Sequence, residues 1–228
     1  MKIGIYGDSF ASSGDKETSW GNQLNKFYTV ENHGRAMTSV EWSLDKFVNT
    51  HEKYDKVVFI VTQPSRMYFP EHPKYPHWTP FTHDLVKNLN KQMRVEYENY
   101  IRFALKYVHN ENMLMLKQTA YLNLVKTLKP QTLFISAFQN CISDYNMLSL
   151  TDIGGLDMQN PKSLNYLHSV FKQNTDPRPC HMNATNNLIL SRKIKHWIET
   201  EEFDLYDIDE FFIPYNREEI FSINKRYR

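Results

Sequence analysis

The chain opens with a short apolar run that ends in small and polar residues, and this stretch constrains the fold more than any other. It reads Lys2-Ile-Gly-Ile-Tyr-Gly-Asp-Ser-Phe10. Such a pattern predicts a β-strand followed by a tight turn. In an open α/β sheet, ligands bind outside the carboxyl ends of the strands, so a serine in this turn would be placed for chemistry. Ser9 is therefore the candidate nucleophile.

The residues around Ser9 have the properties that such a turn requires. Gly4 and Gly7 allow close packing and positive φ, and Asp8 can hold the turn by accepting hydrogen bonds from nearby amides. The Ser9 amide would then stay open toward an oxyanion that forms beside the hydroxyl. The alternative is that Gly-Asp-Ser is only favourable turn chemistry between a strand and a helix. The positions of the other candidate residues must decide between these interpretations.

The composition indicates one globular domain with no preference for polyanions. The chain has 228 residues, 41% of them hydrophobic, and a formal net charge of +1 from 27 basic and 26 acidic residues. This balance argues against nucleic acid and anionic membranes as partners, so a small molecule or a glycan is expected. No apolar run reaches the ~18 residues that a membrane-spanning helix needs.

The early position of the first strand leaves no room for an export signal, which predicts a cytoplasmic protein. Cys141 and Cys180 are then expected to be free thiols. Neither cysteine has the paired spacing of a zinc site, and His72, His77 and His83 lie in a loop rich in proline. We therefore expect no metal and no other cofactor.

Strand-like and helix-like patterns alternate along the chain, which predicts a parallel sheet with helical crossovers. Strands are expected at the N-terminus and at residues 28–32, 56–62 and 132–138. Helices are expected at residues 18–27, 38–49 and 84–128, with a break near Asn110 in the last of these, and from Thr185 onward.

Polar residues or glycine follow the first three predicted strands. Ser9 follows the first, Gly34 the second, and Gln63-Pro-Ser-Arg66 the third. Because the carboxyl ends of parallel strands meet at one edge of the sheet, these residues are expected to lie close together. His181 stands just before the last predicted helix.

Three segments fall outside the alternation. Residues 66–82 combine prolines with aromatic residues, and they form either a substrate wall or a loop packed on its own domain. Residues 139–175 are irregular and form a second insertion. Residues 201–228 are too aromatic to be disordered, which predicts a C-terminal arm packed on the core or on a second subunit of a homo-oligomer.

The order of these residues resembles that of the SGNH (GDSL-type) hydrolases, with Gly7-Asp8-Ser9-Phe10 first, then Gly34, a polar turn and His181. The resemblance extends along nearly the whole chain. It implies one domain, residues 1–228, with a flavodoxin-like three-layer α/β fold. It also implies cleavage of a small ester, for instance an O-acetyl group on a carbohydrate, with Ser9 as nucleophile and His181 as base. The Ser9 and Gly34 amides would be oxyanion donors.

The turn after the third strand departs from the family pattern. Thr62-Gln63-Pro64-Ser65-Arg66 stands where the family has Gly-x-Asn-Asp, so the usual asparagine donor is absent. Gln63 or Arg66 could donate to the oxyanion in its place. The two differ chemically, because arginine carries a fixed charge and a planar fork of donors.

The acid before the histidine is also displaced. The family has its acid three residues before the histidine, where this chain has Arg178. Asp176 lies five residues before His181 and is the candidate for orienting the imidazole, and a backbone carbonyl is the alternative.

Two other functions remain open at this point. A degenerate SGNH domain would bind a glycan or act as a structural subunit, and the two departures and the aromatic loops favour it. A nucleotide-binding Rossmann-like domain would need a phosphate loop, but Gly7-Asp-Ser-Phe-Ala-Ser-Ser-Gly14 lacks both the Walker lysine and the three-glycine spacing. If the site binds a substrate, Asp8, Tyr68 and Trp78 are the candidate contacts.

Overall fold

The computed structural model describes residues 1–12, 17–68, 77–78, 95–96, 98–99, 102–103, 106, 110–137, 182 and 184–203. Its strands are β1 (Lys2–Tyr6), β2 (Thr29–Asn32), β3 (Lys56–Val61), β4 (Met67–Tyr68), β5 (His77–Trp78) and β6 (Thr132–Ser136). Its helices are α1 (Trp20–Leu24), α2 (Val40–Thr50), the 3₁₀ turn η1 (His51–Lys53), α5 (Glu111–Leu128) and α8 (Ala184–Thr200).

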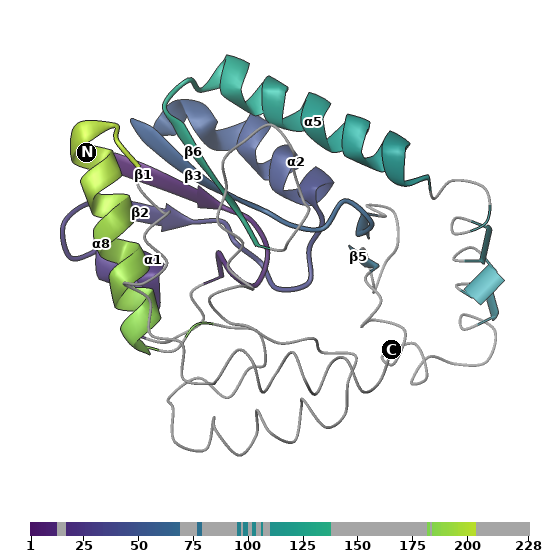
Figure 1. The fold of residues 1–228 in the computed structure, drawn as a ribbon, viewed down its shortest axis with the longest axis horizontal. Helices are drawn as coiled ribbons and strands as arrows, with labels where there is room; N and C mark the ends of the chain where they lie inside the picture. The colour runs from purple at the N-terminus through teal and green to yellow at the C-terminus, as the bar shows by residue number, and fades with distance from the viewer. Residues whose placement is uncertain are drawn as a thin grey trace, which may run out of the picture.

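Four strands form a parallel sheet in the order β2-β1-β3-β6 (Figure 1). Gly4 of β1 pairs with Glu31 of β2 on one side and with Val57 of β3 on the other. This is the strand order of flavodoxin-like doubly wound sheets, where the direction of winding reverses between β1 and β3. The predicted α/β class with a flavodoxin-like parallel sheet is confirmed. Ligands in such sheets bind outside the carboxyl ends of the strands at this reversal.

Strand β3 is buried along its whole length because helices cover both of its faces. Val58 and Ile60 belong to the apolar cluster on one face, and Val57 and Phe59 belong to the cluster on the other. A strand buried on both faces reads as a continuous apolar run, which is why the sequence predicted it.

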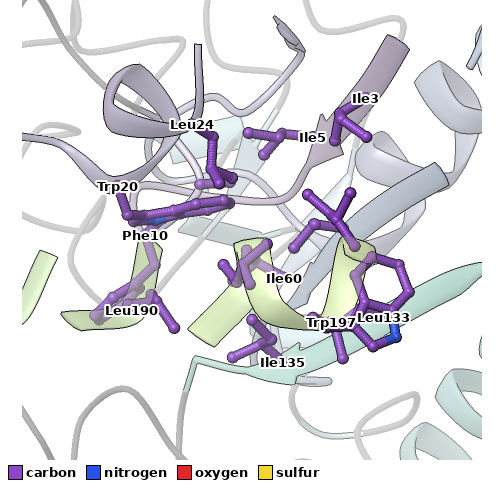
Figure 2. Packing of buried hydrophobic residues seen from close by; sticks show 14 of the residues in the cluster. Ile3, Ile5, Phe10, Trp20, Leu24, Ile60, Leu133, Ile135, Leu190 and Trp197 are labelled. Atoms are coloured by element: carbon purple, nitrogen blue, oxygen red, sulfur yellow. The ribbon is translucent and has the colours of Figure 1, made fainter. Parts of the chain in front are cut away.

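Helices α1 and α8 pack together on one face of the sheet (Figure 1). Their apolar residues meet the inward side chains of β1, β3 and β6 in one cluster, which includes Trp20, Leu24, Leu190, Trp197, Ile5, Ile60 and Ile135. Figure 2 shows this cluster, with Trp20 of α1 lying beside Phe10. The end of the cluster formed by Phe10 and Ala11 comes directly after Ser9 in the chain.

Helices α2 and α5 cover the opposite face (Figure 1). Phe47 of α2 and Leu122 and Val125 of α5 pack with Tyr6 and Phe59 of the sheet. The sheet is therefore the middle of three layers, as the resemblance implied.

Polar side chains fix the starts of three helices. The Ser19 hydroxyl accepts a hydrogen bond from the Asn22 amide at the start of α1, and the Ser39 hydroxyl caps α2. At the start of α5, Asn110 Oδ1 accepts from the Met113 amide at 3.1 Å. Asn110 is the position where the sequence predicted a break between two helices. Such caps satisfy amides that have no partner inside the helix.

Helix α1 is shorter than the predicted helix at residues 18–27. It ends at Leu24, and the Phe27 amide makes a turn bond to the Leu24 carbonyl at 2.9 Å. The chain must reverse here to enter β2 at Thr29, so Phe27 leaves the helical face and is 62% exposed. The prediction that this helix continues to Phe27 is therefore wrong.

The segment rich in proline contains a short antiparallel ladder that the sequence did not predict. In it, Met67 pairs with Trp78 and Tyr68 with His77. The proposed insertion at residues 139–175, the arm beyond residue 203 and most of the predicted helix before Asn110 lie outside the described residues. Among the helices described, none is long and apolar enough to cross a membrane.

Candidate active site

The turn after β1 presents an open backbone amide, that of Ser9. The Asp8 carbonyl accepts hydrogen bonds from the Ala11 amide at 3.1 Å and the Ser12 amide at 2.9 Å. The Asp8 carboxylate accepts from the Phe10 amide at 3.0 Å. Within the described part of the chain, neither the amide nor the hydroxyl of Ser9 has a hydrogen-bond partner. The sequence-based expectation that Asp8 holds the turn and leaves the Ser9 amide open is met by this geometry.

Gly7 is required for the chain to enter this turn. Its φ of 142° lies in the region that L-residues rarely adopt. A Cβ atom at this position would lie 2.6 Å from Ile60 Cβ of the neighbouring strand β3. Glycine therefore lets the turn after β1 pack directly against β3.

The Asp8 side chain is fully buried and forms an ion pair with Arg66, which is also buried. Asp8 Oδ2 accepts hydrogen bonds from Arg66 Nη1 and from the Thr62 hydroxyl, each at 2.8 Å. A buried charge is tolerated when it is paired and hydrogen-bonded in this way. Asp8 thus stabilises the turn from the interior, and its burial does not support the prediction that it contacts a substrate.

Thr38 extends this network to the loop after β2. The Thr38 carbonyl accepts from Arg66 Nη1 at 3.2 Å. The Thr38 hydroxyl donates to the carbonyls of Arg35 at 2.8 Å and Gly7 at 3.3 Å. Side chains from three loops at the carboxyl edge of the sheet are therefore joined around Asp8. Sequence analysis did not identify Thr38 as part of the site, and the next residue, Ser39, caps α2.

Gly34 lies against the turn after β1, as predicted, but its amide already has a partner. The amide donates to Asn32 Oδ1 at 2.8 Å, and Asn32 Nδ2 donates to the Ala11 carbonyl at 2.8 Å. A Cβ atom on Gly34 would lie 2.6 Å from the Ser12 amide nitrogen, so close packing explains the glycine. The Gly34 amide could bind an oxyanion only by sharing or leaving its bond to Asn32.

The two candidates to replace the missing asparagine differ in their burial and in their hydrogen bonds. Arg66 is buried, and its Nη1 donates to Asp8 and Thr38. Gln63 is half-buried, and its amide group has no hydrogen-bond partner among the described residues. Gln63 directly follows Thr62, whose hydroxyl reaches Asp8. This geometry favours Gln63 over Arg66 as a donor to a bound oxyanion.

The predicted base and its acid, His181 and Asp176, lie outside the described residues. The neighbouring residue Met182 is buried in the same apolar cluster as Phe10 and Ala11. Met182 therefore packs on the same face of the sheet as the residues that follow Ser9.

Hydrogen bonds connect Met182 to the turn that carries Ser9. Asn187 Nδ2 donates to the Met182 carbonyl at 2.9 Å, and Asn187 Oδ1 accepts from the Trp20 amide at 3.0 Å. Trp20 Nε1 then donates to the Phe10 carbonyl at 2.8 Å. Sequence analysis provided no signal for Asn187, because its contact with Trp20 joins residues 167 positions apart in the chain.

Tyr68 and Trp78, the other predicted substrate contacts, occur in the ladder of β4 and β5. Tyr68 is half-buried in β4, a strand that lies against α2. For Trp78 the backbone pairing with Met67 is described, but its side chain is not. Their contact with a substrate therefore stays a prediction.

An aromatic cluster lies next to the end of β1. The Tyr6 ring stacks on the His33 ring with centroids 4.9 Å apart, and His33 Nε2 lies 2.7 Å from the Tyr54 hydroxyl oxygen. Burial raises the pKa of Tyr6 to about 12. Burial also lowers the pKa of His33, although the nearby Glu31 carboxylate opposes this shift. His33 is therefore neutral at physiological pH and its Nε2 is engaged by Tyr54.

No group of three or more histidine, cysteine, aspartate or glutamate side chains could hold a metal ion within the residues described. The described chemistry of the edge is thus a serine, an open amide and an unengaged glutamine, next to a buried ion pair.

Comparison with known proteins gives only distant likenesses. No protein-family model and no curated protein matches the chain. One similar solved structure, from Desulfitobacterium hafniense, is assigned to the lipolytic G-D-S-L family. It shares 14% identity with a TM-score of 0.33, over 61% of this chain and 62% of that one. A second, from Veillonella parvula and of the same family, shares 12% identity with a TM-score of 0.31, over 60% and 57%.

A third similar structure is the psychrotrophic esterase EstA from Pseudoalteromonas sp., inhibited by monoethylphosphonate. It shares 14% identity with a TM-score of 0.43, over 87% of this chain and 99% of that one. The chain thus spans less than two thirds of the length of the first two structures. At these identities and TM-scores, any assignment of function must rest on the residues at the edge of the sheet.

Proposed function

We propose that the chain is a serine esterase of the SGNH type that cleaves a small ester through Ser9 and His181. The observation that carries the proposal is the hydrogen-bond pattern of the turn after β1. Asp8 accepts from the amides of Phe10, Ala11 and Ser12, and among the described residues the Ser9 amide has no hydrogen-bond partner beside its own hydroxyl. An open amide next to a serine hydroxyl is the arrangement that acyl transfer needs.

In the proposed mechanism, His181 removes the Ser9 proton and the hydroxyl oxygen attacks the ester carbonyl. The Ser9 amide and the Gln63 side-chain amide donate to the oxyanion that forms. His181 then gives the proton to the leaving alcohol, and water cleaves the acyl-enzyme by the reverse sequence. Asp176 would orient the imidazole. The hydrogen bonds that link Met182 through Asn187 and Trp20 to the Phe10 carbonyl support the placement of His181 near Ser9.

The substrate proposal is a short acyl ester, such as an O-acetyl group on a carbohydrate. Its support is the aromatic composition of residues 66–82, which include Tyr68 and Trp78. Aromatic walls with a few polar groups are common in small-molecule sites. A homo-oligomer formed through the arm at residues 201–228 remains a separate prediction.

The first experiment is labelling with a fluorophosphonate, followed by identification of the modified peptide. We expect labelling at Ser9 in the wild type and none in Ser9→Ala, which should also lose hydrolysis of p-nitrophenyl acetate. The thermal midpoint of the variant should match the wild type, because a half-buried loop serine contributes little packing. A folded wild type that is neither labelled nor active would favour the alternative, a non-catalytic binding domain.

A further inference from the structure

We propose that the buried ion pair between Asp8 and Arg66 is a positioning pair for the esterase site. It holds the Ser9 amide where the oxyanion forms, and it neutralises the Asp8 charge close to that point. Neither residue touches the reacting atoms. The inference rests on the proposed function of Ser9. It adds a role for Arg66, one of the two candidates to replace the missing asparagine.

The first step of the argument is that Asp8 is held at both its backbone and its side chain. Its carbonyl accepts from Ala11 and Ser12, and its carboxylate accepts from Phe10 and from two side chains on the loop after β3. The Ser9 amide belongs to the peptide bond that begins at the Asp8 carbonyl carbon. Fixing Asp8 at both ends therefore fixes the direction in which the Ser9 amide points.

The second step concerns charge. A buried carboxylate one residue from a developing oxyanion would repel it, and the repulsion is strong where water is excluded. Arg66 Nη1 lies 2.8 Å from Asp8 Oδ2, with both side chains buried, so the pair presents little net charge. An oxyanion at Ser9 would then be stabilised by its donors without opposition from Asp8.

The third step separates this role from direct donation by Arg66. The contacts to Asp8 and to the Thr38 carbonyl both come from Arg66 Nη1. A lysine carries the same charge and can place one nitrogen near both acceptors, whereas it cannot reproduce a planar fork aimed at an oxyanion. Arg66→Lys should therefore preserve a positioning role, whereas it should remove direct donation to the oxyanion.

The chain offers a matched control at the opposite end of β3. Lys56 is also a buried cation in an ion pair, with Glu201 Oε1 at 3.1 Å from its Nζ. It begins β3, whereas Arg66 follows the end of that strand. A strand of this length spans about 20 Å, so loss of the Lys56 charge should not reach the site.

The test compares kcat and KM for p-nitrophenyl acetate in Arg66→Met, Arg66→Lys, Lys56→Met and the double variant Asp8→Asn/Arg66→Met. Thermal midpoints and circular dichroism establish that each variant is folded. Misplacement of an oxyanion donor predicts that kcat falls about tenfold or more in Arg66→Met, while KM stays within about twofold. Arg66→Lys should retain kcat within about threefold, because it keeps the charge.

The double variant separates charge from folding. Removing both charges ends the repulsion, so kcat should recover partly relative to Arg66→Met, and Lys56→Met should keep the wild-type kcat. If Arg66→Met does not fold, the contrast between Arg66→Lys and the neutral double variant carries the test, with the lower kcat expected in the double variant. If Arg66→Lys and the double variant both keep the wild-type kcat, the proposal is overturned. Equal damage from Arg66→Lys and Arg66→Met would also overturn it, in favour of direct donation.

Fluorophosphonate labelling of the wild type distinguishes this failure from failure of the proposed function. A wild type that is labelled at Ser9 and hydrolyses the ester, with Arg66 variants that do the same at the same rate, contradicts only the positioning role. A folded wild type without labelling or hydrolysis contradicts both proposals.

Discussion

At the scale of single residues, the burial and pairing of Asp8 distinguish this turn from an ordinary turn between a strand and a helix. An aspartate that only supports a turn can do so from the surface by accepting a nearby amide. Asp8 is instead fully buried and paired with Arg66, and Thr62 donates a further hydrogen bond. Burying a charged pair carries a desolvation cost that a simple turn does not require. The arrangement is easier to explain if the orientation of the Ser9 amide matters.

Gln63 supplies the next prediction at this scale. If its side chain donates to the oxyanion, Gln63→Ala should lower kcat/KM by about thirtyfold, which corresponds to roughly 2 kcal/mol of lost transition-state stabilisation. The measurement is steady-state hydrolysis of p-nitrophenyl acetate. Ser65→Ala is the matched control, because Ser65 is half-buried in the same loop and has no hydrogen bond to any described residue. Wild-type kcat/KM in Gln63→Ala would leave the Ser9 amide as the main donor.

The role of Asp8 within its own turn could be predicted from the sequence, whereas its partner could not. Asp8 and Phe10 are two residues apart, so their contact follows from local turn chemistry. Arg66 is separated from Asp8 by 58 residues. That contact exists only because β1 and β3 are neighbours in the sheet, and Arg66 was accordingly proposed as an oxyanion donor rather than as the partner of Asp8.

At the scale of elements, α1 is too short to be stable alone and depends on its neighbours. Trp20 connects it to α8 through Asn187 and to the nucleophile turn through the Phe10 carbonyl. Trp20→Phe keeps an aromatic ring but leaves that buried carbonyl without its donor. We expect the free energy of unfolding to fall by about 1–3 kcal/mol, measured by urea denaturation.

The same variant should lower kcat, because the turn that carries Ser9 loses one of its supports. Trp42→Phe is the control, since Trp42 is buried in α2, the helix on the opposite face of the sheet. It should lower stability without a change in kcat. Equal kcat values in the two variants would mean that α1 supports the fold and not the site.

The elements that the sequence predicted well are those with a continuous pattern. The apolar run of β3 and the capped start of α5 at Asn110 needed no information from distant residues. The end of α1 at Leu24 and the exposure of Phe27 depend on where the chain must turn to enter β2. The ladder of β4 and β5 was missed because each strand has only two residues.

At the scale of the whole molecule, the position of the site follows from the strand order. Alternating strands and helices predicted a parallel sheet, but only pairing between strands can tell that β1 lies between β2 and β3. That order places the loops after all three strands at one edge of the sheet. Hydrogen bonds from Arg66 to Asp8 and to Thr38 connect these loops there. Met182, which precedes α8, is linked to the same edge through Asn187 and Trp20.

The stability of the whole molecule should depend on pH through His33. Its imidazole is enclosed by Tyr6, which stacks on it, and by the Tyr54 hydroxyl, while Glu31 Oε1 lies 3.6 Å from Nε2. Burial lowers its pKa below the ordinary 6.5, and Lys53 and Lys46 act in the same direction, whereas Glu31 opposes them. The folded state therefore binds a proton at this position less readily than the unfolded chain does.

The sign of the effect follows from proton linkage. Between the lowered pKa of His33 and its unfolded value of about 6.5, the unfolded state binds more protons, so stability falls as the pH falls through this range. Urea denaturation at pH values from 7 to about 5 should show a smaller decrease in unfolding free energy for His33→Gln than for the wild type. The exposed His196 provides the control variant His196→Gln, which should follow the wild-type slope. If the unfolding free energy of His33→Gln depends on pH with the same slope as that of the wild type, His33 has the same pKa in the folded and unfolded states. In that case the enclosure of His33 between Tyr6 and Tyr54 does not destabilise its protonated form.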